Sequence, residues 1–420
     1  MKVIDVRCGD AAAELKKLSD CSVQCCVTSP PYWGLRDYGV DGQLGLEPTP
    51  DEYVAKMVAV FSEVRRVLRE DGTLWMNLGD SYVRTGETNV PQTKDHRADY
   101  PLHLKEGSSD GRVGRSDRPG TRSNANGLKP KDLCGIPWRV AFALQADGWY
   151  LRSDIIWHKP NPMPESVTDR PTKSHEYLFL LTKNQRYYYD AEAIKEPSVD
   201  PEGSENRYKS EFGGAKADAR IEQGLVTTPK GTREFNGTRN KRTVWTIPTS
   251  PYSEAHFATF PPDLIKPCIM AGTSARGCCP KCFAPWVRVV EKEKHKVSDS
   301  PRSSGNGDRN DSEDGRYQSE TRTIGWEPVC ECGRDDAMSL WNSNADSMNQ
   351  WNELGEDEQK ELISKANAPI PCTVLDPFGG SGTTGMVALE LGRKAILIEL
   401  NPEYIELINR RTFVTQGLSL

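Results

Sequence analysis

Residues 372–399 read CTVLDPFGGSGTTGMVALELGRKAILIE, and this stretch decides the fold that the sequence predicts. Residues 372–375 are an apolar run typical of a buried strand, residues 376–385 are rich in glycine, and residues 386–391 have helical character. A second apolar strand follows at 394–398 and ends in Glu399. Glycines let the backbone approach a ligand, and a helix N-terminus presents unpaired amides. The stretch therefore predicts a nucleotide-binding α/β unit, in which Glu399 accepts hydrogen bonds from ribose hydroxyls.

The glycine loop differs from a phosphate-binding loop of the GxxxxGK[ST] type. No lysine precedes Thr383, and Phe378 places an apolar ring where a pyrophosphate would need amide groups. We therefore expect a ligand with an adenosine end and a less anionic tail. A dinucleotide oxidoreductase and a simple glycine turn are the alternatives.

A second informative stretch, residues 27–34, reads VTSPPYWG. Its two prolines fix φ and remove amide donors, so they end the strand expected at 22–27 and leave a rigid turn. The backbone carbonyls and the Ser29 hydroxyl can accept hydrogen bonds from an exocyclic amine, and Tyr32 offers a face on which a base can stack. This chemistry points to modification of a nucleobase amine. The alternative is an ordinary turn in which Tyr32 only packs.

Together, Thr-Ser-Pro-Pro-Tyr and Asp-Pro-Phe-Gly-Gly-Ser-Gly-Thr-Thr resemble the motifs of the S-adenosylmethionine-dependent DNA amino-methyltransferases. In that family, a catalytic motif that precedes the cofactor loop marks the β class, a circular permutation of the Rossmann-like methyltransferase fold with a mostly parallel sheet. The Ser-Pro-Pro-Tyr variant is most often found in enzymes that methylate cytosine N4, and Asp-Pro-Pro-Tyr in those that methylate adenine N6. The resemblance thus implies site-specific methylation of cytosine N4 in DNA, with adenine N6 as the near alternative. A non-catalytic DNA-binding protein with this fold is a more distant one.

The resemblance also implies roles for individual residues. The catalytic element would be Ser29, Pro30, Pro31 and Tyr32, which hold a flipped base for direct displacement. The cofactor-binding residues would be Asp10, Phe260, Asp376, Pro377, Phe378, Gly380, Ser381, Gly382, Thr383, Thr384 and Glu399. Asp10 would accept the adenine amine, although capping of the following helix is an equally good explanation for an aspartate there. Phe260 belongs to a segment, 256–261, that resembles the part of the family covering the methionine end.

The remaining pattern alternates helices with strands, which predicts a largely parallel α/β sheet. We expect helices at 11–18, 51–69 and 137–146, and strands at 73–78, 149–157 and 176–182. Residues 157–162 either line the target pocket or form a structural turn. The expected divisions of the chain are a catalytic half at 1–190 with a flexible insertion at 83–132, a target-recognition region at 191–250, a cofactor-covering segment at 251–276, a zinc-binding insertion at 277–336 and a cofactor-binding half at 337–420.

Two close cysteine pairs suggest a structural metal. Cys279 and Cys282 form one pair, and Cys330 and Cys332 form the other. Two short cysteine knuckles suit tetrahedral thiolate coordination of zinc, and Cys278 could take the place of Cys279. Reduced thiols without a metal are the alternative.

Composition limits the class of protein further. The chain has 420 residues, of which 36% are hydrophobic, and no apolar run approaches the roughly 20 residues of a membrane span. Without a signal peptide, twelve scattered cysteines predict reduced thiols in a cytoplasmic enzyme. The absence of Pro-Cys-Gln argues against C5 methylation of cytosine. We expect a double-stranded DNA substrate. A net charge of -6 means that binding it needs a local basic surface, for which 84–131 and 207–242 are candidates unless they are solvated loops.

Overall fold

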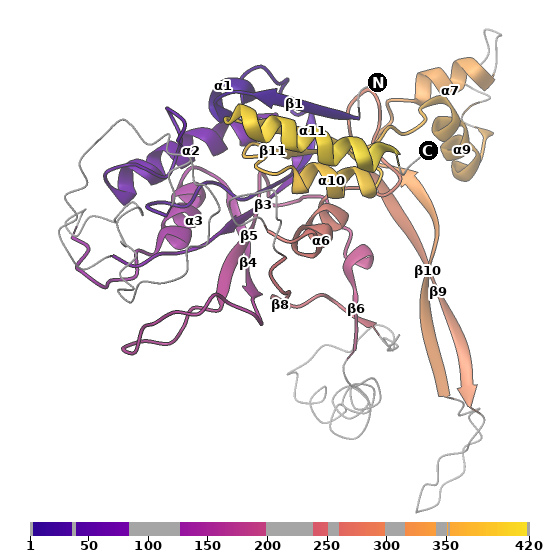
Figure 1. Ribbon diagram of the computed structural model, residues 1–420. Coiled ribbons are helices and arrows are strands. Elements are labelled where there is room, and N and C mark those ends of the chain that lie inside the picture. Colours follow the sequence, from indigo (N-terminus) through magenta and orange to yellow (C-terminus); the bar gives the residue numbers. More distant parts are fainter. Residues whose placement is uncertain are drawn as a thin grey trace, which may run out of the picture. The chain divides into compact units, whose positions relative to one another are not determined.

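The computed structural model describes residues 3–35, 39–83, 127–198, 238–250, 260–298, 316–341, 351 and 353–417 (Figure 1). The chain divides into two compact units. The first unit comprises Met1–Tyr187, Thr243–Ile269 and Thr373–Leu420, and the second comprises Tyr188–Arg242 and Met270–Cys372. Most of the insertion expected at 83–132, the centre of the target-recognition region and residues 251–259 of the cofactor-covering segment lie outside the described residues.

The first unit contains one eight-stranded sheet with the strand order β1-β12-β11-β2-β3-β5-β4-β8. All neighbouring strands are parallel except β5, which is antiparallel to both β3 and β4. The expectation of a mostly parallel α/β sheet is confirmed. The strands are β1 (Ile4–Cys8), β2 (Val23–Thr28), β3 (Leu68–Leu78), β4 (Tyr150–His158), β5 (His175–Thr182), β8 (Val244–Thr246), β11 (Thr373–Asp376) and β12 (Lys394–Glu399).

The strand order confirms the circular permutation. A doubly wound nucleotide-binding sheet has the spatial order 3-2-1-4-5. The segment β1-β12-β11-β2-β3 has this order if β11 is counted as the first strand, β12 as the second and β1 as the third. The unit that opens the fold therefore stands near the end of the described chain, and the fourth strand, β2, stands near its beginning.

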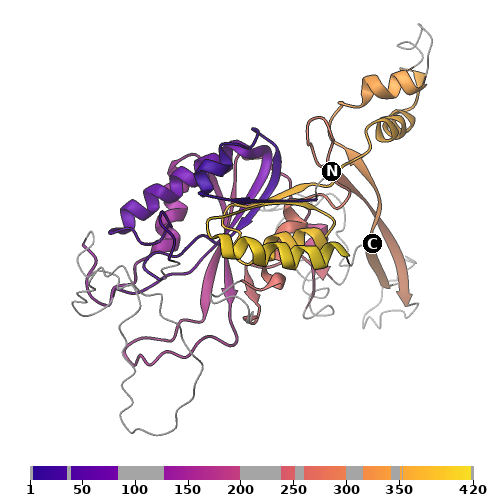
Figure 2. The same cartoon turned by 45° about the horizontal axis from the view of Figure 1, so that its top comes forward.

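Helices cover both faces of the sheet, as Figure 2 shows for α1 and α2 on one side and for α10 and α11 on the other. The helices are α1 (Ala11–Leu15), α2 (Pro50–Val67), α3 (Ile136–Ala146), α6 (Pro262–Gly272), α10 (Thr383–Glu390) and α11 (Pro402–Gly417). Helix α2 illustrates the local signals: Thr49 caps its N-terminus by accepting from the amide of Glu52, and Pro50 follows in the first turn. Its buried face, which includes Phe61, packs in the core on this side of the sheet.

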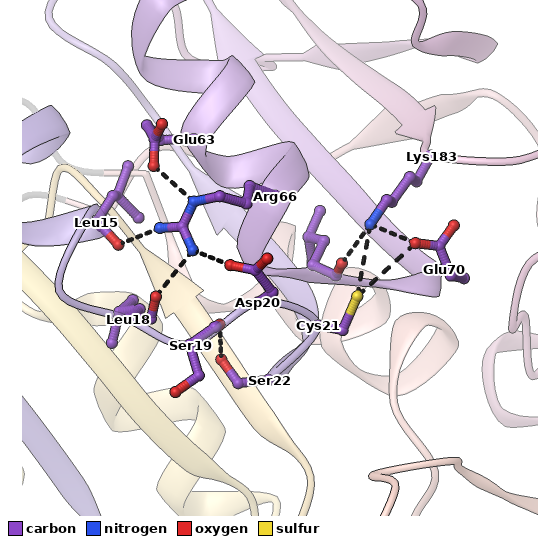
Figure 3. Close-up of polar contacts among 11 residues, drawn as sticks. Leu15, Leu18, Ser19, Asp20, Cys21, Ser22, Glu63, Arg66, Glu70 and Lys183 are labelled. Carbon is purple, nitrogen blue, oxygen red and sulfur yellow. Dashed lines mark hydrogen bonds and ion pairs between the residues drawn. The ribbon is translucent and has the colours of Figure 1, made fainter.

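A polar network anchors the segment that leads into β2 (Figure 3). Arg66, in the last turn of α2, donates to the carbonyls of Leu15 (2.8 Å) and Leu18 (2.9 Å) and pairs with Glu63 (2.8 Å) and Asp20. One guanidinium thus joins α2 to the end of α1 and to the turn before β2. Because β2 leads directly to Ser29, this network supports the position of the proline turn.

Three boundaries differ from the sequence-based expectation by three residues or more. Helix α10 begins at Thr383 rather than at 386, because Gly382 adopts a left-handed conformation (φ +79°) and serves as its N-cap. Helix α1 ends at Leu15 rather than at 18. The backbone at Leu68 is already extended (ψ 139°), so β3 begins where the apolar helical pattern of α2 still continues.

The second unit carries an antiparallel hairpin of β9 (Trp286–Ser298) and β10 (Arg316–Pro328). At its base, Arg288 donates to both carboxylate oxygens of the buried Asp190, at 3.0 and 2.8 Å to Oδ2 and 3.2 Å to Oδ1. The other elements of this unit are η1 (Glu192–Ile194), β6 (Glu196–Pro197), β7 (Thr238–Arg239), α7 (Arg334–Trp341) and α9 (Glu356–Ala366). No helix among the described residues of the chain has the length and apolar character that a membrane crossing requires.

Candidate active site at the carboxyl edge of the sheet

The glycine loop and the proline turn meet at the centre of the sheet. Strands β11 and β2 are parallel neighbours, with Val374 beside Cys25 and Leu375 beside Cys26. From this pair the chain proceeds to β12 on one side and to β3 on the other, so the pair is a topological switch point. Ligands of open α/β sheets bind outside the carboxyl ends of the strands at such a point. Both motifs follow directly from these carboxyl ends.

Asp376 joins the two motifs through its carboxylate. Its Oδ1 accepts from the Thr28 hydroxyl (2.6 Å) and from the Phe378 amide (3.1 Å), and its Oδ2 accepts from the Thr384 hydroxyl (2.7 Å). Burial raises the pKa of Asp376 to about 7, although these hydrogen bonds act to lower it. Thr28 and Asp376 are 348 positions apart in the sequence. The carboxylate therefore fixes the backbone of the glycine loop against the strand that carries Ser29.

Glu399 reaches the same loop from β12. Its Oε2 accepts from the Gly380 amide (2.7 Å) and its Oε1 from the Asn401 amide (2.8 Å). Burial raises the pKa of Glu399 above its ordinary value. The sequence pattern, by its likeness to nucleotide-binding folds, predicted that the glycine loop and Glu399 lie close together. The structure places them within hydrogen-bonding distance.

The first turn of α10 is held from α11. Arg411 Nη1 donates to the Ser381 carbonyl (2.7 Å), the Ser381 hydroxyl (2.8 Å) and the Thr383 hydroxyl (3.2 Å). Pro377, Ser381, Gly382, Thr383 and Thr384 are buried, whereas Phe378 and Gly380 are half-buried. Gly380, Gly382 and Gly385 have the GxGxxG spacing of dinucleotide-binding loops, so the glycines alone do not distinguish the ligand.

The proline turn carries a small hydrogen-bonded cluster. The Ser29 hydroxyl lies 3.3 Å from the Tyr32 oxygen and 3.5 Å from Asn77 Oδ1. Pro30 is buried, and the Pro31 carbonyl accepts from the Tyr53 hydroxyl (2.8 Å). The Ser29 hydroxyl and the Pro30 carbonyl, which are expected to hold an amine, are therefore on a turn whose backbone is fixed on one side by the core.

The ring of Tyr32 is held at both its edge and its hydroxyl. The hydroxyl lies 2.7 Å from Glu176 Oε2 and 3.1 Å from Asn77 Oδ1. Glu176 pairs through its other oxygen with Lys159, whose Nζ also lies 4.3 Å from the centroid of the Trp157 ring. A Cβ on Gly79 would stand only 2.6 Å from Tyr32 Cε2. Tyr32 therefore has little freedom to move toward the end of β3.

Two further cofactor candidates have simpler surroundings. Asp10 caps α1 by accepting from the Ala13 amide (2.9 Å), which is the capping role considered as an alternative. Its proposed contact with an adenine amine stays a prediction. Phe260 is half-buried and directly precedes Pro261 and α6, and the rest of its segment, 256–259, lies outside the described residues.

The four predicted cysteines come together in the second unit. The Sγ atoms of Cys279, Cys282, Cys330 and Cys332 all lie within 4.8 Å of one another. Burial acts to raise the pKa of Cys279, but donors that include Asn367 Nδ2 (3.1 Å) and the Lys281 amide (3.4 Å) bring it down to about 6. Cys278 lies outside this cluster: its backbone pairs with Ile370, and its Sγ lies 3.9 Å from the Pro371 carbonyl oxygen.

Asn77, Glu176 and Arg411 are the residues that the sequence reasoning missed. Asn77 precedes the end of β3, and Glu176 follows the start of β5. Because these strands are antiparallel, with Leu78 beside Tyr177, the end of one and the start of the other meet at the same sheet edge. A polar residue beside each predicted strand end was the available signal, but it required the strand order. No pattern in the sequence marks Arg411.

The fold and the paired motifs define a permuted Rossmann-like methyltransferase, and comparison with known proteins agrees. A family model described as DNA methylase, for N6 and N4 methyltransferases, matches residues 23–283 and 356–410. The Type II methyltransferase M.Cfr9I of Citrobacter freundii is 48% identical over 265 residues, which are 63% of this chain and 71% of that protein. The Type II methyltransferase M.SmaI of Serratia marcescens is 36% identical over 403 residues, which are 96% of this chain and 88% of that protein. The cytosine-N4-specific PvuII DNA methyltransferase has a TM-score of 0.46 at 14% identity, with 97% and 88% of the two chains covered.

This chain belongs to the β class of S-adenosylmethionine-dependent DNA amino-methyltransferases. The family methylates an exocyclic amine of cytosine or adenine, so the prediction of a DNA methyltransferase is confirmed at that level. A dinucleotide oxidoreductase is ruled out by the family match, which extends over both halves of the site.

Proposed function

We propose that this enzyme methylates the exocyclic N4 of cytosine at a specific site in DNA. The observation that carries this proposal is the hydroxyl of Ser29, which stands at the switch point beside Tyr32 and next to the strand that leads into the glycine loop. A serine at the first position of the motif is the variant that the resemblance associates with cytosine N4. Adenine N6 is the alternative, because a hydroxyl and a carbonyl can accept from either amine.

The proposed catalytic roles follow from the turn. The Ser29 hydroxyl and the Pro30 carbonyl accept hydrogen bonds from the target amine, and the ring of Tyr32 stacks on the extruded base. These contacts orient the nitrogen lone pair, and such positioning supplies much of the acceleration of a direct displacement. A base inside a duplex must be flipped out first, at a cost of a few kcal/mol.

The residues of the glycine loop fit the cofactor of the family. When bound, S-adenosylmethionine supplies an electrophilic methyl group on its sulfonium. Glu399, which already lies on the loop amide of Gly380, would bind the ribose hydroxyls, and Asp10 the adenine amine. Asp376, Pro377, Phe378, Gly380, Ser381, Gly382, Thr383 and Thr384 would shape the cradle, and Phe260 would cover the methionine end. The carboxylate of Asp376 acts here by holding the backbone of the loop.

The decisive experiment analyses the nucleosides of treated DNA. Double-stranded DNA of mixed sequence is incubated with the enzyme and S-adenosylmethionine, digested and examined by mass spectrometry. We expect N4-methylcytosine, and we expect Ser29→Ala to reduce it strongly while the affinity for S-adenosylhomocysteine stays within about twofold. N6-methyladenine in its place would establish the alternative base. Binding of DNA and cofactor without any methylated nucleoside would establish a non-catalytic protein.

Recognition of the DNA sequence is proposed for residues 191–250. Within the described part of this region, Arg239 and Arg242 donate to Glu196 at 2.9 and 3.2 Å, so these two arginines are already ion-paired. Contacts with base edges are therefore expected from other positions of the region. The relatives M.Cfr9I and M.SmaI are Type II methyltransferases, which supports modification of a defined site.

We also propose that the cysteine cluster holds a structural zinc ion. Zn–S bonds of about 2.3 Å in a tetrahedron place the sulfur atoms roughly 3.8 Å apart, which is compatible with four Sγ atoms that lie within 4.8 Å. One cysteine pair precedes β9 and the other follows β10. The ion would therefore close the base of a two-stranded hairpin, and such a hairpin is only marginally stable by itself.

Metal analysis tests the zinc proposal. After dialysis against a weak chelator, we expect about one zinc per chain, and loss of the metal in Cys282→Ser together with a lower unfolding temperature. Cys278→Ser is the matched control, because Cys278 is adjacent to the cluster but outside it. Less than about half an equivalent of zinc in the unaltered protein would instead indicate plain thiols.

A further inference from the structure

Glu176 lies between the proposed base-stacking ring and a cation. Its Oε2 is 2.7 Å from the Tyr32 hydroxyl, and its Oε1 pairs with Lys159 Nζ. The side chains of Glu176 and Lys159 are only 16% and 18% exposed. Each oxygen of the Glu176 carboxylate therefore has one partner. At this depth, solvent screens the charged pair of Glu176 and Lys159 only a little.

The geometry also determines the direction of the hydrogen bonds. A phenol has one proton, and two acceptors compete for that of Tyr32: Glu176 Oε2 at 2.7 Å and Asn77 Oδ1 at 3.1 Å. The closer, ionised carboxylate takes it, because hydrogen bonds to charged acceptors are roughly twice as strong as neutral ones. The lone pairs of the Tyr32 oxygen then remain to accept from the Ser29 hydroxyl at 3.3 Å.

Asn77 reinforces the same direction. Its Nδ2 donates to the Tyr177 carbonyl (3.0 Å), which turns its Oδ1 toward Tyr32 and Ser29. Ser29 is thereby surrounded by two acceptors for its own proton. A serine whose proton is directed to Tyr32 or Asn77 keeps its lone pairs for an incoming N–H, which is the role that an amine acceptor needs.

We propose that Glu176 is a positioning residue that acts through Tyr32. It holds the ring at its hydroxyl and orders the protons so that Ser29 accepts from the target amine. This inference rests on the proposed methyl transfer but applies to a cytosine or an adenine amine alike. Lys159 contributes by keeping the second carboxylate oxygen occupied.

The variant Glu176→Gln tests this polarity with little change in size. The Lys159 ammonium can only donate, so the amide oxygen turns to it and the amide nitrogen faces Tyr32. The Tyr32 oxygen then accepts where it formerly donated, so its proton turns to Asn77 Oδ1 and competes with the Ser29 hydroxyl for that acceptor. We expect the single-turnover rate of methyl transfer to fall roughly 10- to 100-fold, while the dissociation constant of S-adenosylhomocysteine changes less than twofold.

A double-mutant cycle with Tyr32→Phe separates positioning from a merely structural role. Phenylalanine removes the hydroxyl through which Glu176 acts, so Glu176→Gln should cause less than a twofold further loss in that background. Glu165→Gln is the matched control: Glu165 pairs with Arg170 in the connection between β4 and β5, and this change should leave the rate within twofold.

Two results would overturn the proposal: a full rate in Glu176→Gln, or losses that multiply in the double variant. The rate is counted as methyl groups transferred per enzyme, whichever base receives them. A methylated adenine would therefore refute the cytosine assignment and leave the test of Glu176 intact.

Discussion

Replacing Gly79 with alanine should slow methyl transfer without weakening cofactor binding. The added Cβ would stand 2.6 Å from Tyr32 Cε2, 3.1 Å from Cδ2 and 3.4 Å from Glu176 Cδ. The φ angle of Gly79 lies outside the left-handed region, so the backbone itself accepts alanine. Non-bonded carbon atoms need about 3.5 Å, and the ring of Tyr32 must therefore shift by about 1 Å.

A displacement of this size at a substrate-positioning group reduces catalysis by about 100-fold. The assay is single-turnover transfer of labelled methyl to DNA, accompanied by calorimetry with S-adenosylhomocysteine and by thermal unfolding. Gly325→Ala is the matched control, because a Cβ there meets nothing within 4 Å. A full rate in Gly79→Ala, with an unchanged unfolding temperature, would refute the idea that the position of Tyr32 limits the reaction.

Three further predictions concern the cofactor loop and the fold. Glu399→Ala should weaken S-adenosylhomocysteine binding at least 10-fold, as measured by calorimetry. The reason is that the amides of Gly380 and Asn401 lose a charged acceptor and the ribose loses its partner. An unchanged dissociation constant would count against the ribose role. Because burial raises the pKa of Asp376 to about 7, the folded protein retains a proton that the unfolded chain releases above about pH 4, and stability falls as pH rises until about pH 7. Relative to Asp376→Asn, the unaltered protein should lose about 2 kcal/mol of unfolding free energy between pH 5.5 and 8 in denaturant titrations, and parallel curves for the two proteins would contradict this. Arg66→Met should lower the unfolding free energy by about 2–4 kcal/mol, because two carbonyls and two carboxylates lose their donor, and a loss below about 0.5 kcal/mol would show that the network contributes little.

The local signals for the cofactor loop were strong enough to be recognised without a structure. The glycines at 379–385, the apolar strands on either side and Glu399 all lie within 28 residues of one another, between Cys372 and Glu399. Contacts over such short separations need only the parallel pairing of β11 with β12, which the strand, helix and strand pattern itself predicts. The hydrogen bond from the Gly380 amide to Glu399 is of this kind.

The cysteine cluster shows where local reasoning stops. The residue types and the two short pairs were evident, but the choice between Cys278 and Cys279 was open. In the folded chain Cys278 pairs through its backbone with Ile370, more than 90 residues away in the sequence, and Cys279 joins the cluster. Only the folded chain supplies that partner.

The sequence by itself determined the class of this protein: its glycine loop, its proline turn and their order along the chain predict a permuted methyltransferase. Tertiary structure decided how the site is held. Asp376 binds Thr28, and Glu176 binds Tyr32 from 144 positions away. These pairs depend on strand order and on the antiparallel register of β3 and β5, which bring distant side chains to one edge of the sheet. A sequence motif contains the side chains and backbone groups that bind the ligand or hold the base. The partners that orient those groups depend on packing between segments far apart in the chain.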